Sequence, residues 1–339
     1  MRSLLTFVVA VLFGVMCGAL TLIYYDGNIA AAIWSGVIAE LCFFTIIFIE
    51  RRVVQERLRR MSFLRALFLR TAIQLALIVF YFSFGAAIYS WMGSGGRSSS
   101  VFPIGDKFWI MLSVPVIILL LLNMIRQMSR MLGQNVLANI IVGKYSEPVE
   151  EERIFMFLDL DASTTIAERL GNIRYHNLLD DYVYDITRPI LDSHGEIYQY
   201  VGDEVVVTWS DSHVNRGAES INCFFRISDT MDQLAPKYQK KYGFVPGFKA
   251  GFHCGTVVAG QIGDVKKEIV FQGDVVNTAS RIKETCGSLG VKMLISRELL
   301  DKLPMENSSY KTLRAGSFLL KGKEREVELY SVAKADSIS

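Results

Sequence analysis

The chain has 339 residues, of which 51% are hydrophobic, and its mean hydropathy is +0.30. A chain this apolar is not expected to be a purely soluble protein, and its length accommodates a membrane part and a separate soluble domain. The net charge of +2 indicates no polyanionic partner, so nucleic-acid binding is not expected. The five cysteines show neither metal-ligand spacing nor a disulfide framework, which predicts free thiols in a reducing compartment.

The first part of the chain contains four apolar segments, at residues 4–24, 29–49, 71–92 and 108–125. Each is long enough to cross a hydrocarbon layer of ~30 Å as a helix. We therefore expect a four-helix transmembrane domain over residues 1–125, with membrane lipid as a partner. The first segment also fits a cleaved signal peptide, but the immediate second segment favours a retained helix.

Basic residues set the expected orientation of these segments. Five arginines crowd the link between the second and third segments: Arg51, Arg52, Arg57, Arg59 and Arg60. The loop at residues 93–107 contains only Arg97 and Lys107. Because short loops rich in Lys and Arg stay in the cytoplasm, we expect an integral protein of the cytoplasmic (inner) membrane with both termini in the cytoplasm. The outer loops have no room for a folded sensor domain, so the stimulus would be an unknown membrane ligand, a membrane partner, or none.

One carboxylic acid, Glu40, falls in the middle of the second apolar segment. A charge at that depth is costly unless it faces the bundle interior, a partner or a ligand, so Glu40 is a functional candidate. The alternative is an interhelical hydrogen bond from the protonated acid, for which Gln74 in the third segment is a possible partner.

Residues 126–152 link the membrane part to the soluble domain. Met128 and Ile140 belong to an approximately helical apolar stripe, which would continue the fourth segment and pair with its copy in a second chain. Gly143 and Pro148 are expected to end this helical linker. The linker is the physical route from the membrane to the soluble domain.

Strands and helices alternate from residue 153 to residue 333, which predicts an α+β domain. The expected strands are 154–158, 196–200, 205–209, 248–254, 256–262, 293–295, 310–320 and 325–332. The expected helices are 163–170, 172–193, 212–242 and 274–286. Residues 334–339 form a short tail.

Two aspartates end neighbouring β-prone runs in this domain. Asp159 interrupts the apolar run at residues 154–158, and Asp203 follows Gly202 in a hairpin turn. If the hairpin lies beside the first strand, the two carboxylates meet and repel each other unless a cation such as Mg²⁺ binds between them. The alternative is that each is a turn or capping residue.

A third motif places an amide and a guanidinium on one helix. Asn277 and Arg281 are four residues apart, so they lie on the same face of the helix expected at 274–286. This pair suits a phosphate or a ribose, because Arg offers a planar fork of donors to phosphate oxygens. For an isolated Asn-x-x-x-Arg, a solvated helix face is the alternative.

These motifs occur in a defined order along the chain. The elements are Phe157-Leu158-Asp159-Leu160, Tyr200-Val201-Gly202-Asp203-Glu204, Gly251-Phe252-His253-Cys254-Gly255, Gly273-Asp274-Val275-Val276-Asn277-Thr278-Ala279-Ser280-Arg281 and Leu320-Lys321-Gly322-Lys323. Over residues 153–332 the chain resembles the class III nucleotidyl cyclases, and ordered agreement of several motifs is more specific than any one of them. The resemblance implies a ferredoxin-like catalytic core, here joined to a membrane anchor of the bacterial type.

The resemblance also implies roles for individual residues. Asp159 and Asp203, with the backbone carbonyl of Leu160 as a further ligand, would hold two Mg²⁺ or Mn²⁺ ions per active site. Asn277 would orient the ribose and Arg281 would stabilise the charged transition state. The terminal phosphates would bind one of two lysines, Lys321 or Lys323. In such enzymes the metal pair of one chain faces the Asn and Arg of another, which implies a homodimer through the catalytic domain and the linker.

The two positions expected to read the base depart from the family pattern. Gln199 stands where adenylate cyclases have Lys and guanylate cyclases have Glu, and Val270 stands where adenylate cyclases have Asp or Thr. A Gln amide both donates and accepts, so it fits either purine. Because the Glu that would accept the two donors of guanine is missing, the favoured function is an adenylate cyclase. The alternatives are a guanylate cyclase and a membrane receptor that binds nucleotide without turnover.

Overall fold

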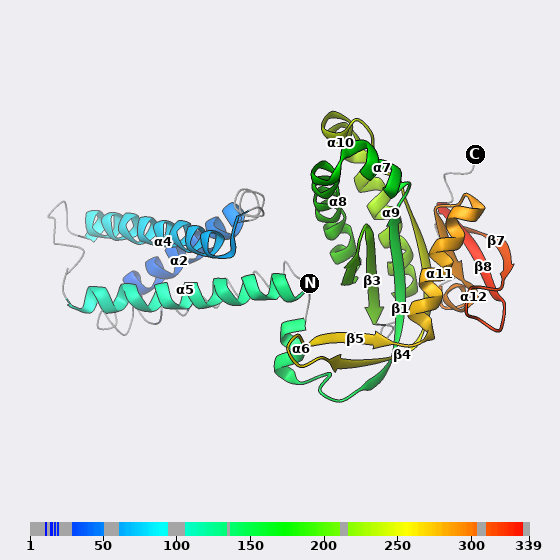
Figure 1. The fold of residues 1–339 in the computed structure, drawn as a ribbon. Coiled ribbons are helices and arrows are strands. Elements are labelled where there is room, and N and C mark those ends of the chain that lie inside the picture. The colour runs from blue at the N-terminus through cyan, green and yellow to red at the C-terminus, as the bar shows by residue number, and fades with distance from the viewer. Residues whose placement is uncertain are drawn as a thin grey trace. The chain divides into compact units, whose positions relative to one another are not determined.

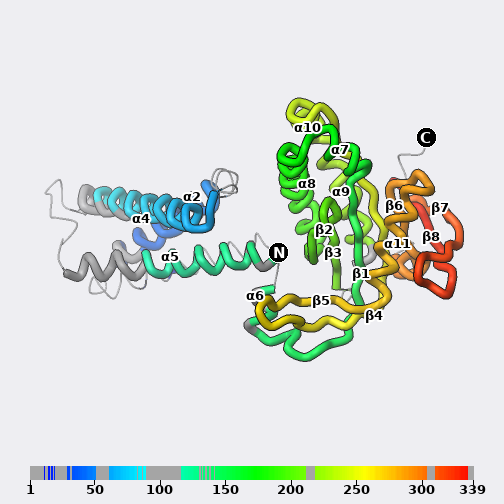
Figure 2. The backbone as a smooth tube through the Cα atoms, in the orientation of Figure 1, coloured from blue at the N-terminus to red at the C-terminus, as the bar shows by residue number. Residues whose placement is uncertain are grey.

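The computed structural model describes residues 29–50, 61–93, 106–133, 136–210, 216–303 and 310–334, together with positions 11, 14, 15, 17 and 19 (Figures 1 and 2). The chain divides into two compact units, residues 1–131 and residues 132–339. The described residues do not include most of the first apolar segment, the arginines at 51–60, the loop around Arg97 or residues 335–339 of the tail.

The described part of the first unit consists of helices. The main ones are α2 (Ile29–Ile49), α4 (Phe63–Gly93) and α5 (Asp106–Leu132). Two polar contacts join α2 to α4: Trp34 Nε1 donates to the Gly85 carbonyl at 3.1 Å, and the hydroxyls of Thr45 and Tyr81 lie 2.7 Å apart. Gly85 of α4 also allows the two helices to lie close together, because an added Cβ there would collide with the side chain of Ile38 on α2.

Of the described helices, one stretch, Phe63–Gly85, is long and apolar enough to cross a membrane, whereas Ile33–Ile49 and Val116–Ser129 are apolar but shorter. The prediction of four spans is therefore supported at the third segment, and the other three spans stay predictions. The helix of the third segment begins at Phe63 rather than at residue 71. The added turns contain Arg65 and Arg70, which lower hydropathy but are good helix formers.

The linker is not one continuous helix. Gly133 has a φ of +98°, which L-residues rarely adopt, and it follows the end of α5 at Leu132. A short helix, α6 (Val136–Val142), comes next. The first strand, β1 (Val149–Leu160), begins earlier than expected because the residues from Val149 to Arg153 pair with the end of a long neighbouring strand. Tertiary pairing overrides the low strand propensity of the three glutamates here.

The second unit is built on an 8-stranded sheet with the order β2-β3-β1-β4-β6-β8-β7, in which β5 pairs with β4 (Figure 1). All its pairings are antiparallel except that of β4 with β6. The remaining strands are β2 (Glu196–Val201), β3 (Glu204–Ser210), β4 (Phe248–Ile262), β5 (Glu268–Gln272), β6 (Met293–Ser296), β7 (Tyr310–Phe318) and β8 (Val327–Lys334). The helices are α7 (Ser163–Leu170), α8 (Asn172–Asp192), α9 (Arg216–Gln233), α10 (Ala235–Tyr242), α11 (Asp274–Leu289) and α12 (Arg297–Leu300).

Two further expected elements differ in the structure. The strand pair predicted at 248–254 and 256–262 is one strand, β4, because Gly255 pairs with Arg153 inside the ladder instead of turning the chain. The absent side chain at Gly255 makes room for Val275, whose Cγ2 would lie 2.9 Å from an added Cβ. The helix predicted at 212–242 is divided into α9 and α10, since Pro236 fits only the first turn of a helix.

The apolar run before Asp159 is explained by two cores. Ile154, Met156 and Leu158 belong to the core that α8 and α9 cover, whereas Phe155 and Phe157 belong to the core under α11 (Figure 1). Alternate residues of β1 therefore face opposite sides of the sheet, and both sides are buried. Because β1 is buried on both faces, its carboxyl end is held rigidly, and that end carries Asp159.

A buried arginine joins the start of the domain to two further strands. Arg153 Nε donates to Glu151 at 2.6 Å and Arg153 Nη1 donates to Glu196 of β2 at 3.0 Å. Its guanidinium also lies 4.4 Å from the ring centre of Phe271 on β5, and Arg153 Nη2 donates to the hydroxyl of Tyr145 at 3.2 Å. This cluster fixes β2 and β5 relative to β1.

Candidate active site

The two aspartates meet at one end of the sheet, as the sequence predicts. Asp159 is near the end of β1, and Asp203 lies in the turn between β2 and β3. The pairing of Leu158 with Val205 brings that turn beside the end of β1. Gly202, with a φ of +65°, supplies the left-handed turn residue.

The environment of Asp203 shows that the two acids repel each other. Burial raises the pKa of Asp203, a hydrogen bond with Ser163 opposes this, and the charge of Asp159 and its hydrogen bond with Asp203 raise the pKa further. The net direction is upward. Asp203 Oδ2 is buried and accepts no hydrogen bond in the structure. A buried carboxylate oxygen in this condition is costly unless a cation or a proton approaches it.

These features fit a divalent cation bound by Asp159 and Asp203. Within the described ranges, no group of three or more His, Cys, Asp or Glu side chains is arranged to hold a metal ion. A cation here would therefore take its remaining ligands from water, the backbone or a bound phosphate. Mg²⁺ commonly binds in this way, through one or two carboxylates plus substrate phosphates.

Two lysines that the sequence reasoning missed also lie in this site. Lys283 Nζ of α11 lies 3.3 Å from Asp159 Oδ2 and 2.8 Å from Glu204 Oε2. Lys249 Nζ of β4 lies 3.5 Å from Asp159 Oδ2 and 3.5 Å from Asp161 Oδ1. The sequence contained a signal for Lys283, because it follows Ile282 and is four residues beyond Ala279, both on the buried face of α11.

Close packing of α11 on β4 carries Lys283 into the site. At Gly251 of β4 an added Cβ would lie 2.2 Å from the backbone nitrogen of Lys283, so only glycine allows this approach. Burial lowers the pKa of Lys283, but its hydrogen bonds and ion pairs with Glu204 and Asp159 outweigh burial and raise that pKa overall. Lys283 is therefore an ammonium ion at neutral pH.

The structure places Asn277 and Arg281 on a different side of α11 from Lys283. Asn277 is exposed, and Arg281 Nη1 donates to Glu284 Oε1 at 2.7 Å and to Glu284 Oε2 at 2.8 Å. Residues 277, 281 and 284 follow helical spacing, so they share one face. The Asn and Arg thus lie together, as predicted, and Arg281 contacts Glu284 rather than the acid pair.

The two phosphate-binding candidates have different surroundings. Lys323 forms an ion pair with Asp274 in the first turn of α11, and its side chain is 22% exposed. Lys321 is exposed in the connection between β7 and β8. Only Lys323 is therefore tied to the helix that carries Asn277 and Arg281.

The base-reading candidates lie on strands that touch. Tyr198 occupies a bulge in β2 just before Gln199. Its ring centre lies 5.0 Å from that of Phe271 on β5, and its hydroxyl accepts a hydrogen bond from the Phe271 backbone at 3.4 Å. Gln199 is exposed and Val270, next to Phe271, is half-buried. The structure thus brings β2 and β5 together beside these two positions.

A comparison with known proteins places this geometry in a family. Residues 145–334 match the model of the adenylate and guanylate cyclase catalytic domain. The chain belongs to this cyclase family. The match includes Tyr145, which is buried and bonded to Arg153.

Individual cyclases resemble the chain to different degrees. It is 40% identical over 173 residues to "Adenylate cyclase 2" of Rhizobium meliloti (strain 1021), covering 51% of this chain and 48% of that protein. It is 26% identical over 186 residues to "Adenylate cyclase" of Anabaena cylindrica, covering 52% and 36%. The chain thus spans about half or less of the length of these relatives. The structure of a bacterial light-regulated adenylyl cyclase has the same fold, with a TM-score of 0.56 and 20% identity over 70% of this chain and 67% of that one.

Proposed function

We propose that this protein is a membrane-anchored adenylate cyclase that converts ATP to 3′,5′-cyclic AMP and pyrophosphate at sites shared across a homodimer. The observation that carries the proposal is the convergence of Asp159 and Asp203 at the end of β1, with a buried Asp203 oxygen that accepts no hydrogen bond, in a domain of the cyclase family. Two relatives with this domain are named adenylate cyclases.

The residues of this site would divide the work of an in-line phosphoryl displacement. Asp159 and Asp203, with the Leu160 carbonyl, would hold two Mg²⁺ or Mn²⁺ ions, which when bound favour the ionised 3′-hydroxyl and neutralise the α-phosphate. Asn277 would orient the ribose. Arg281 would release Glu284 and donate to the α-phosphate, where negative charge develops. Lys323, rather than Lys321, would bind the terminal phosphates because it forms an ion pair with Asp274 in the first turn of the same helix.

The positions of these groups on one chain support a shared site. Lys283 faces the acid pair of its own chain, whereas Asn277 is exposed on another side of α11. A second copy related by a two-fold axis would supply its own Asn277 and Arg281 to the acid pair, and each chain would serve its partner in the same way. Two equivalent sites would then form per homodimer.

ATP is the substrate we favour. Gln199 is exposed on β2 and offers both a donor and an acceptor to the purine edge. A Glu would accept hydrogen bonds from the two donors of guanine, but neither Gln199 nor Val270 supplies a carboxylate. GTP remains the second candidate because a Gln amide fits the guanine edge as well.

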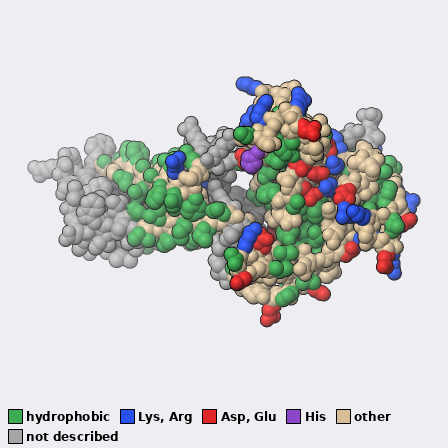
Figure 3. Space-filling view, in the orientation of Figure 1, with side chains coloured by type: hydrophobic (Ala, Val, Ile, Leu, Met, Phe, Trp, Pro, Cys, Tyr) green, Lys and Arg blue, Asp and Glu red, His purple; other side chains and the backbone are tan. Residues whose placement is uncertain are grey.

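The distribution of polar and apolar side chains in the first unit supports membrane anchoring. Asn123 of α5 donates to Gln74 at 2.8 Å and to Thr71 at 3.1 Å, and all three side chains are buried. Large apolar side chains are exposed instead: Ile33, Leu41, Phe44, Phe48, Phe80, Phe84 and Leu121. On the face that Figure 3 shows, hydrophobic side chains cover much of the described part of this unit. Apolar groups outside and polar groups between helices are the arrangement that lipid favours.

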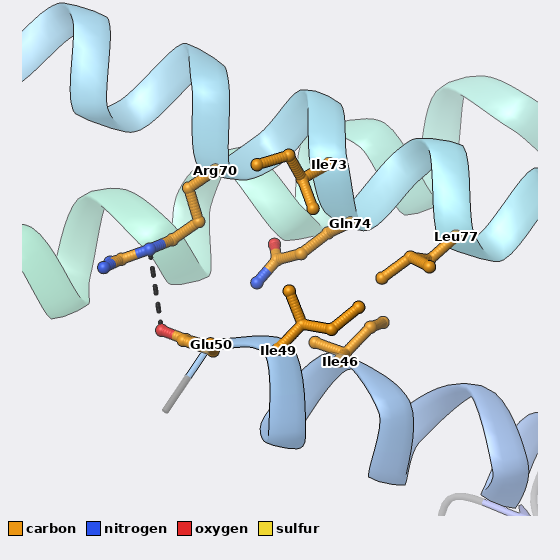
Figure 4. A pocket seen from close by; sticks show the side chains of 7 residues that line it. All are labelled: Ile46, Ile49, Glu50, Arg70, Ile73, Gln74 and Leu77. Atoms are coloured by element: carbon orange, nitrogen blue, oxygen red, sulfur yellow. Dashed lines mark ion pairs between the residues drawn. The ribbon is translucent and has the colours of Figure 1, made fainter. Parts of the chain in front are cut away.

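Charged residues tie the same three helices together at one end. Glu50, which follows α2, lies 3.5 Å from Arg70 Nε of α4 and 3.3 Å from Arg126 Nη1 of α5. Figure 4 shows Glu50 and Arg70 beside a small pocket that Gln74 also lines. Gln74 accepts a hydrogen bond from Asn123, and its pairing with Glu40 stays a prediction. In our proposal this charged end faces the cytoplasm, with both termini there.

The experiment that tests the function measures product formation by the full chain, purified in detergent, with Mn²⁺ and either ATP or GTP. We expect cyclic AMP as the main product, and none from an Asp159→Ala variant purified in parallel. Cyclic GMP as the main product would favour the guanylate cyclase instead. Nucleotide binding without any cyclic product would favour a receptor that does not turn its ligand over.

A further inference from the structure

The two aspartates of the site carry their negative charge in different ways. Asp159 Oδ2 faces two ammonium groups, Lys283 Nζ at 3.3 Å and Lys249 Nζ at 3.5 Å. Asp203 Oδ2, in contrast, is buried without a hydrogen-bond partner. One acid is thus neutralised by lysines of its own chain, and the other is not.

Lys283 is held firmly in this position. Its side chain is 13% exposed, as is that of Glu204, and the two lie 2.8 Å apart. Glu204 directly follows Asp203 in the chain. Lys283 therefore contacts one carboxylate at the end of β1, Asp159, and one carboxylate at the start of β3, Glu204. The close packing of α11 at Gly251 leaves its backbone little freedom to withdraw.

A lysine in this position can have one of two effects. As a purely structural ion pair it would hold Asp159 in place, and its removal would weaken cation binding. As a competing charge it would occupy the oxygen that a divalent cation needs, and its removal would strengthen cation binding. The second effect is favoured because Asp159 does not need Lys283 to stay in place. Without Lys283, it would still be held by its position at the buried end of β1 and by its ion pair with Lys249.

We propose that Lys283 is a positioning residue that competes with the divalent cation for Asp159 and so sets the cation affinity of the site. This inference rests on the proposed function only for the identity of the two metal-binding aspartates. In this role the Lys283 ammonium bridges Asp159 and Glu204, and it moves away from Asp159 when a cation binds. The cation affinity would then be lower than the two carboxylates alone would give.

The test measures Mn²⁺ binding to the full chain in detergent, without nucleotide, from the electron paramagnetic resonance signal of free Mn²⁺. Lys283→Met and Lys283→Gln remove the charge, and the Gln amide still donates to Glu204 if the Met variant does not fold. Lys283→Arg keeps the charge. Lys266→Met is the matched control, because Lys266 pairs with Glu268 on the exposed β4–β5 connection.

We expect the Mn²⁺ dissociation constant to fall about tenfold or more in the two neutral variants, since a nearby positive charge opposes a divalent cation strongly in a partly buried site. It should stay within about twofold of wild type in Lys283→Arg and Lys266→Met. Mn²⁺ binding by the folded neutral variants that is equal to or weaker than that of wild type would overturn the proposal. Binding by Lys283→Arg as tight as that of the neutral variants would overturn it as well. The readout is independent of turnover, so a chain that makes no cyclic nucleotide would refute the proposed function but leave this test valid.

Discussion

The two sides of α11 differ in whether their polar side chains contact groups on other elements of the same chain. On the inner side Lys283 contacts Asp159 and Glu204, and the acid pair is assembled by strands of the same sheet. On the outer side Asn277 is exposed and Arg281 contacts its helix neighbour Glu284. The inner half is a formed site, whereas the outer half presents donors to something beyond the chain. In the proposed homodimer, the two sides of α11 would therefore serve two different active sites, one formed with each side.

The largest effect should come from removing an inner carboxylate. Asp159→Ala or Asp203→Ala should lower the rate of cyclic AMP formation by about a thousandfold or more, because the cations that stabilise the transition state lose a ligand. Gel filtration should show the same assembly as wild type. A variant that retains full activity would refute the metal-binding role of that residue.

Mixing variants of the two halves tests whether they belong to different chains. Arg281→Ala alone should lower the rate by roughly a hundredfold. When this variant is mixed with Asp203→Ala, half of a random population of dimers is mixed and each mixed dimer has one intact site, so about a quarter of the wild-type rate should return. Pull-down of one tagged chain by the other verifies mixing. No recovery in verified mixed dimers would mean that each chain completes its own site.

Substitution of Gln199 tests whether this residue of β2, near the inner half, recognises the purine base. Gln199→Lys should raise the ratio of ATP to GTP turnover by roughly tenfold, because an ammonium donates to the acceptors of adenine and opposes the donors of guanine. The ratio of kcat/KM for the two nucleotides is the measurement, and Lys240→Gln on exposed α10 is a control. An unchanged ratio would show that Gln199 does not read the base.

A smaller effect concerns stability rather than rate. The pKa of Asp203 is raised above its ordinary value of 3.8, first by burial and then by Asp159, so the folded state binds this proton more tightly than the unfolded state. Ionisation of Asp203 therefore lowers the free energy of unfolding, and this destabilisation is largest at neutral pH, where the carboxyl is ionised.

Asp203→Asn should accordingly stabilise the domain in EDTA at pH 7 by roughly 0.5–1 kcal/mol, a figure reduced for solvent screening. The advantage should fade as the pH falls toward and below about 4, because Asp203 then becomes protonated in the folded and the unfolded states alike. Thermal unfolding followed by tryptophan fluorescence measures the difference between the proteins. A destabilised Asn variant at pH 7 would show that the repulsion between the two acids is not significant.

The order of elements was readable from the sequence because each depends on local chemistry. The apolar run before Asp159 predicted a strand buried on both faces, and Gly202 predicted the turn that carries Asp203. The helix containing Asn277 and Arg281 was predicted from spacing. Features that depend on distant partners were predicted wrongly, such as the early start of β1 and the passage of β4 through Gly255. One local feature, the division of the helix predicted at 212–242 at Pro236, was also missed. Local propensity does not report which strand will lie alongside.

The sequence by itself determined which chemical groups this protein has and which of them share a helix face or a strand end, because spacing along regular backbone fixes those relations. Only the tertiary structure decided that Lys283 contacts Asp159 and that β2 and β5 meet through Tyr198 and Phe271. Each of these contacts joins a charge or a ring to a specific neighbour. Such neighbours are set by how α11 and the β-hairpins pack on the sheet, and that packing depends on shape complementarity over the whole domain.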